Sequence, residues 1–168
     1  VSELGVGDGR GYSVNLPLYP YTGDDDYVDC FGQVVMPLIR AFAPDVLVTQ
    51  LGIDSYHTDP LTHLQVTTEC YIEVIRQLSS LGLPWLAMGG GGYDVTAVAR
   101  AWTLAYGVML EAEWPDQLPP GFVREHGGSR LRDDTSPEVP GHIKVEARRY
   151  ADESVAAVRA QVFPTHGL

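Results

Sequence analysis

The sequence Pro84-Trp85-Leu86-Ala87-Met88-Gly89-Gly90-Gly91-Gly92-Tyr93-Asp94 joins an apolar run to four consecutive glycines and a tyrosine. Apolar residues at helical spacing follow over residues 95–106, so the pattern predicts a strand, a loop and then a helix. Open α/β sheets place their ligand sites where a strand ends and a helix begins. Because glycine loses more backbone freedom on folding than any other residue, four in a row indicate backbone that must come close to another group.

Tyr93 is the first large polar side chain after the glycines. A tyrosine hydroxyl in that position can donate a hydrogen bond to negative charge that develops during a reaction. A partly buried tyrosine whose hydroxyl is satisfied by a neighbour would give the same sequence. The glycine run favours the functional interpretation.

Further strand and helix patterns lie before the glycines. Together the predicted elements are strands over residues 12–18, 45–51 and 84–88 and helices over residues 27–42, 68–80 and 95–106. Their alternation predicts an α/β fold with a parallel sheet covered by helices. Thr67 and Asp94 are expected to cap the second and third helices, and Pro37 is expected to kink or split the first.

The two ends of the chain differ from this regular part. Gly5, Gly7, Gly9 and Gly11 indicate the inside of a loop, and the chain does not begin with methionine, so we expect the C-terminal part of a longer polypeptide. Prolines and glycines break up residues 111–142, which are expected to form a long surface excursion. Residues 145–162 then have the pattern of a terminal amphipathic helix.

Composition limits the possible functions. The 168 residues can form one domain with a sizeable core, and no apolar run approaches the roughly 20 residues that a bilayer requires. The net charge of −11 disfavours binding to nucleic acid or to an anionic membrane. We expect Cys30 and Cys70 to be buried thiols of a cytoplasmic protein rather than a disulfide.

A second group of polar residues follows the strand predicted over residues 45–51. Asp54 lies there, with His57, Asp59 and His63 close behind it. Since parallel strands end at one edge of a sheet, Asp54 and Tyr93 could converge on one site. A carboxylate at a strand end can bind a metal ion, but it more often caps a turn or a following helix, and Asp59-Pro60 favours a turn.

Four ordered motifs resemble the histone deacetylase superfamily over about residues 1–106. They are Gly9-Arg10-Gly11-Tyr12-Ser13-Val14-Asn15-Leu16-Pro17-Leu18, Gln50-Leu51-Gly52-Ile53-Asp54, Asp59-Pro60-Leu61 and Gly89-Gly90-Gly91-Gly92-Tyr93. The form of residues 59–64 is most similar to the bacterial acetoin utilisation deacetylases. The resemblance implies a three-layer arginase/deacetylase-like α/β fold with a mostly parallel sheet, of which residues 1–110 would be the C-terminal part. Residues 111–168 would then form an excursion and a helix that pack on the same domain.

The resemblance also implies a zinc-dependent hydrolase that removes acetyl groups from acetyl-lysine. It assigns zinc binding to Asp54 and a hydrogen bond to the substrate carbonyl to Tyr93. It further implies that Leu61 lines an apolar substrate tunnel and that the backbone at Gly91 and Gly92 comes close to this tunnel. The backbone carbonyl of Tyr12 would bind a structural potassium ion, and Gln50 would lie directly behind the metal. The substrate would be an acetylated protein, with acetyl-CoA synthetase a candidate, or a small acetylated amine.

The chain departs from the family pattern in one respect. The family's other zinc ligands lie in an Asp-x-His motif, and its catalytic histidines are adjacent; both precede the segment that resembles residue 1, and this chain contains neither. One carboxylate does not hold a catalytic zinc, which normally has three protein ligands. We therefore expect the 168 residues alone to be inactive, with apolar sheet faces exposed. The alternatives are a non-catalytic truncated remnant, a partner-binding α/β domain, or an unrelated α/β domain whose glycine loop binds an anion.

Overall fold

A computed structural model describes all of residues 1–168 and contains a two-stranded parallel sheet. Strand β1 (Leu47–Leu51) pairs with strand β2 (Trp85–Gly89), in a register that runs from Leu47 opposite Trp85 to Leu51 opposite Gly89. Helix α3 (Thr68–Ser79) connects the two strands, as parallel pairing requires. The α/β class predicted from the alternating pattern is confirmed.

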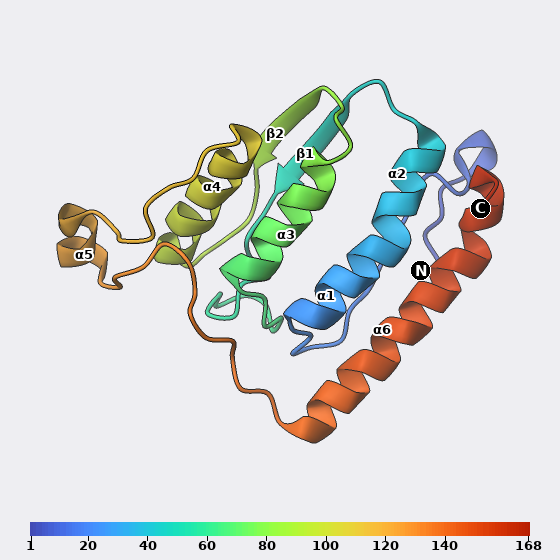
Figure 1. Cartoon of the computed structure of the whole chain (residues 1–168). Helices are drawn as coiled ribbons and strands as arrows, with labels where there is room; N and C mark the ends of the chain where they lie inside the picture. Colours follow the sequence, from blue (N-terminus) through green and yellow to red (C-terminus); the bar gives the residue numbers. More distant parts are fainter.

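Helices α3 and α4 (Val95–Met109) pack together against one face of this sheet (Figure 1). Their shared core contains Ile53, Tyr56, Tyr71, Ile75, Ala97, Ala101 and Ala105, with Leu51 and Trp85 from the strands packed against it. Both predicted caps are present. The Thr67 hydroxyl accepts a hydrogen bond from the Glu69 N–H, and the Asp94 carboxylate accepts bonds from two N–H groups in the first turn of α4.

The first predicted helix runs unbroken from residue 24 to residue 42. It consists of α1 (Asp24–Cys30), a π-helical stretch (Phe31–Val35) and α2 (Met36–Phe42). Pro37 therefore does not split the helix. Proline has no N–H to donate to the helix. In the π turn just before it, the Met36 N–H donates a hydrogen bond to the Phe31 carbonyl, which shifts the helical hydrogen-bond pattern at that point.

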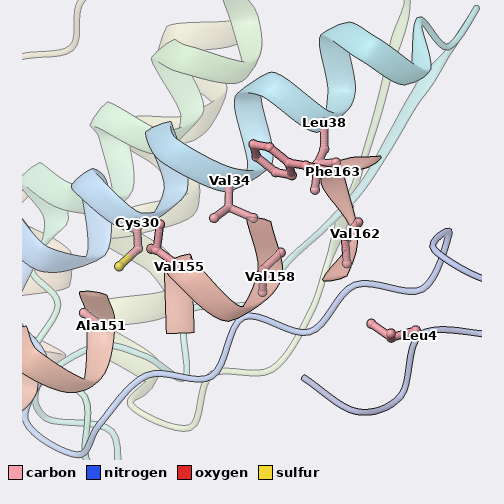
Figure 2. Close-up of a cluster of buried hydrophobic side chains, with 9 residues drawn as sticks. All are labelled: Leu4, Cys30, Val34, Leu38, Ala151, Val155, Val158, Val162 and Phe163. Carbon is pink, nitrogen blue, oxygen red and sulfur yellow. The ribbon is translucent and has the colours of Figure 1, made fainter. Parts of the chain in front are cut away.

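The C-terminal helix α6 (Gly141–Gln161) lies along the α1–α2 helix, far from the sheet (Figure 1). Figure 2 shows the apolar contact between the two helices, with Val34 facing Val155 and Val158 and Leu38 beside Phe163. The complete buried cluster is Leu4, Cys30, Val34, Leu38, Ala151, Val155, Val158, Val162 and Phe163. The predicted terminal helix is confirmed, although it begins at residue 141.

Residues 111–142, which are rich in proline and glycine, do not lie only on the surface. They contain helix α5 (Pro120–His126), and they bury Leu118 and Leu131 against Ile72 of α3 and Leu104 of α4. Apolar side chains at two separated positions thus anchor the excursion to the helices.

The strand predicted over residues 12–18 is wrong. This segment has no strand partner, and its Leu16 and Leu18 pack against the cluster shared by α1, α2 and α6. Residues with strand propensity form a strand only where a neighbouring backbone completes the ladder, and here the nearest packing surface is helical.

The second face of the sheet carries exposed apolar side chains, as expected. Val48 lies opposite Leu86 in the strand register, and the two residues are 54% and 56% exposed. Cys30 and Cys70 are both buried and free, as expected. No helix in the chain is both long enough and apolar enough to span a membrane.

Candidate functional site

The candidate site lies where β1 and β2 end, on the loops formed by residues 52–67 and 90–94. The Ile53 N–H donates a hydrogen bond to the Gly91 carbonyl over 2.8 Å, which ties the two loops together. This pairing carries the strand register beyond the sheet, and it brings Asp54 and Tyr93 to the same edge.

The glycines allow these loops to approach each other. A Cβ atom on Gly91 would lie 2.2 Å from Oδ2 of Asp54, and one on Gly90 would lie 2.5 Å from the Gly52 nitrogen. Both distances are far below van der Waals contact, so only glycine fits at these two positions. The group that the glycine backbone approaches is the Asp54 loop itself.

Gly92 has a second reason to be glycine. Its φ of +138° lies in a region that L-residues rarely adopt, and a Cβ there would lie 2.7 Å from side-chain methyls of both Ile53 and Val98. Tyr93, which follows this glycine, is 54% exposed.

Asp54 is fixed through its backbone. Its carbonyl accepts a hydrogen bond from the Thr62 hydroxyl, and its carboxylate lies against the Cα of Gly91. The loop therefore closes on itself between residues 54 and 62, and the polar side chain is held at the end of β1.

Asp59 joins the two loops a second time. Its carboxylate accepts the Leu61 N–H on Oδ1 over 2.9 Å and the Tyr93 N–H on Oδ2 over 2.8 Å, and the residue is only 7% exposed. The sequence places Asp59 near His57 and His63, and its Asp-Pro pair predicts a turn. The turn is present, because the bond to Leu61 spans two residues, but the bond to Tyr93 could not be read from local sequence.

Asp94 makes a third connection. Its carboxylate caps α4 through the N–H groups of Thr96 and Ala97, and it also accepts the hydroxyl of Thr58 from the neighbouring loop. Burial disfavours the charged form, but these hydrogen bonds outweigh it and lower the pKa of the Asp94 carboxyl.

A partly buried polar network supports the Asp54 loop. Asp133, in the excursion after α5, accepts hydrogen bonds from the Tyr56 hydroxyl over 2.7 Å, from Arg100 and from the Thr68 N–H. Burial raises the pKa of Asp133, but the bonds from Arg100, Thr68 and Tyr56 lower it by more. Burial, reinforced by the adjacent carboxylate, raises the pKa of Tyr56. Sequence reasoning missed this network because its members are far apart in the chain.

The two histidines of the loop do not join Asp54. The ring of His57 lies on Tyr56 at 4.4 Å between centroids, and that of His63 stacks on Tyr21 at 6.2 Å. No three His, Cys, Asp or Glu side chains of the chain are grouped so that they could hold a metal ion. The residues present therefore do not fit a complete catalytic zinc site.

The other predicted residues lie on different parts of the chain. Leu61 is 66% exposed on the rim of the loop, and Gln50 lies within β1 opposite Met88. Tyr12 is not part of this edge, because it lies beside the beginning of β1, packed against the rings of Phe42 and His166.

The sequence of residues 1–109 matches the family described as "Histone deacetylase domain". The chain thus belongs to the histone deacetylase family, and its two parallel strands with their helices represent part of the arginase/deacetylase fold.

Individual relatives agree with this assignment. The acetoin utilization protein AcuC of Bacillus subtilis (strain 168) is 36% identical over 129 residues, which cover 73% of this chain and 33% of that protein. AcuC of Staphylococcus xylosus is 35% identical over 162 residues, covering 90% of this chain and 42% of the relative. Histone deacetylase 1 of Homo sapiens is 34% identical over 135 residues, covering 80% and 28%. The chain thus spans less than half the length of these relatives.

Proposed function

We propose that this chain forms one wall of the active site of a deacetylase that hydrolyses acetyl-lysine in a protein or a small acetylated amine. The observation that carries the proposal is the pairing of two strand ends, which presents Asp54 and Tyr93 on loops joined by the Ile53–Gly91 hydrogen bond. Family membership supplies the reaction class.

In this proposal, Tyr93 donates its hydroxyl hydrogen bond to the oxygen of the acetyl group. That oxygen gains negative charge as the amide carbon becomes tetrahedral, and a fixed donor stabilises the charge more in the transition state than in the substrate. The exposure of Tyr93 supports this role, because more than half of the residue is accessible from outside the chain.

The remaining residues surround this donor. Leu61, on the rim, would line the passage for the apolar lysine stem, and Gly91 and Gly92 would let the backbone come close to that passage. Gln50 would lie behind the metal, and the backbone carbonyl of Tyr12 would bind a structural potassium ion away from the reacting atoms.

Asp54 is proposed as one ligand of a catalytic zinc ion. A single carboxylate does not meet the requirement of about three protein ligands, so this role needs further ligands that these 168 residues do not supply. We therefore expect the isolated chain to bind zinc weakly and to have no hydrolytic activity.

The test uses the complete gene product that contains this chain. It should release acetate from an acetyl-lysine peptide, and Tyr93→Phe should lower kcat by about 100-fold or more with a small change in KM, the size seen when one oxyanion donor is lost. Tyr106→Phe, which changes another exposed tyrosine, is the matched control. Turnover of Tyr93→Phe equal to that of the control would contradict the assigned role. Acetylated acetyl-CoA synthetase and small acetylated amines are then the substrates to compare.

A partner-binding domain without catalysis is the second candidate, and the exposed apolar face formed by Val48, Leu86 and Met88 favours it. Two results together would support this alternative. The complete gene product would have no deacetylase activity, and a partner that copurifies with it would be lost in the Leu86→Lys variant.

A further inference from the structure

Asp59 is the only acidic residue among the buried residues of the chain, which has 22 Asp and Glu residues in total. Buried carboxylates are normally paired with a cation or saturated with hydrogen bonds. In Asp59 both carboxylate oxygens accept hydrogen bonds from backbone groups: the Leu61 N–H donates to one oxygen and the Tyr93 N–H to the other. The burial of this acid thus serves to join two loops.

The two N–H groups belong to the residues that the proposed function places against the substrate. Tyr93 follows Gly92, and glycine backbone is less restricted than that of any other residue because it has no Cβ. Its position is fixed by the Ile53–Gly91 bond on one side and by Asp59 on the other. Leu61 lies on an exposed rim, and its N–H is held by the same carboxylate.

We propose that Asp59 is a positioning residue that sets the placement of Tyr93 relative to Leu61. The inference rests on the proposed function, since it assigns Asp59 to the geometry of that reaction. The carboxylate is suited to the task because both of its oxygens accept. An asparagine has one accepting oxygen and an NH₂ group that would face a backbone N–H, so Asp59→Asn keeps one bond and releases the other loop.

The control is a carboxylate with the same type of bonding elsewhere. Asp24 accepts the Thr67 N–H over 2.8 Å and the Thr67 hydroxyl over 2.6 Å, and so joins α1 to the start of α3 through bonds that do not involve residues 89–94. Asp24→Asn should cost stability in a similar way but leave the placement of Tyr93 intact.

The first measurement needs no activity. Amide hydrogen exchange, followed residue by residue by NMR in the complete gene product, should show protection at both Tyr93 and Leu61. In Asp59→Asn at least one of these amides should exchange about 10-fold faster or more, as expected when a hydrogen bond is lost, while both stay protected in Asp24→Asn. Unprotected Tyr93 and Leu61 amides in the unmodified protein would overturn the proposal even if no variant folds.

The second measurement is a kinetic cycle with an acetyl-lysine peptide. Asp59→Asn should lower kcat by about 100-fold, the cost of a misplacement of about 1 Å, whereas Asp24→Asn should stay within about threefold of the unmodified enzyme. In a Tyr93→Phe background, Asp59→Asn should cost little more, because the donor that it positions is already gone. An equal loss in both backgrounds would show a general structural role and overturn the proposal. If the unmodified protein has no deacetylase activity, the proposed function fails, and the exchange measurement still decides whether Asp59 holds the two loops.

Discussion

The hydroxyl of Tyr56 donates a 2.7 Å hydrogen bond to the carboxylate of Asp133, a residue 77 positions later in the chain. Tyr56 lies two residues after Asp54, whereas Asp133 lies outside the 1–109 segment that matches the deacetylase family. The excursion after α4 therefore supports the loop that carries the candidate metal ligand.

Replacement of Asp133 should destabilise the chain. The ion pair that Asp133 forms with Arg100 has side chains only 12% and 14% exposed, so Asp133→Ala leaves Arg100, Tyr56 and the Thr68 N–H without their acceptor. We expect a loss of about 2–4 kcal/mol in the free energy of unfolding, as for other broken buried pairs. Urea denaturation followed by circular dichroism measures it.

The exposed ion pairs of α6 provide the control for that experiment. Arg149 binds Glu146 and Glu153 on the surface, so Arg149→Ala should leave the urea midpoint nearly unchanged. A midpoint for Asp133→Ala as high as that of Arg149→Ala would show that the network contributes nothing to stability.

The same carboxylate predicts how stability depends on pH. The pKa of Asp133 is lower in the folded chain than its ordinary value of about 3.9, so its contribution is complete above that value and is lost as the pH falls through the folded pKa. The free energy of unfolding should therefore decrease as the pH falls below about 4. In Asp133→Asn this decrease should be smaller. Urea midpoints measured from neutral to acidic pH test the difference, and parallel pH profiles for the two proteins would contradict the assignment.

Gly91→Ala should disrupt the candidate site. The added Cβ would lie 2.2 Å from the Asp54 carboxylate, so the two loops would have to separate. We expect a loss of about 1–3 kcal/mol in stability, as for other overpacked positions, together with a large loss of deacetylase activity. Gly141→Ala is the matched control, because no atom lies within 4 Å of its added Cβ at the start of α6. Equal behaviour of the two variants would show that the loops do not need this close approach.

The elements that sequence predicted well are those defined by local patterns. The run of apolar residues before Gly89 gave β2, and the caps Thr67 and Asp94 marked the starts of α3 and α4. The close approach at the glycines was also predictable, because four glycines in a row indicate backbone that must come near another group. That the glycines approach the Asp54 loop could be known only from the register of the two strands.

The parts that sequence missed depend on distant partners. Asp59 bonds to Tyr93 across 34 positions, and Asp133 bonds to Tyr56 across 77, so no local spacing indicates either contact. The strand predicted over residues 12–18 failed for the related reason that a strand needs a neighbouring backbone, which local sequence does not supply. Polar residues in loops are therefore the ones whose roles the structure changed most.

The two cysteines provide a test of the helical core that is independent of activity. Burial, with the nearby charge of Asp29, raises the pKa of the Cys30 thiol to about 11, and burial also raises the pKa of Cys70. Since the thiolate is the reactive form, both cysteines should react very slowly with Ellman's reagent at neutral pH in the folded chain. Both should react rapidly in guanidinium chloride, because unfolding exposes them and returns the pKa to about 8.5. Rapid modification of Cys30 under native conditions would contradict the packing of α6 on α1, since Ala151 and Val155 belong to the cluster that buries Cys30.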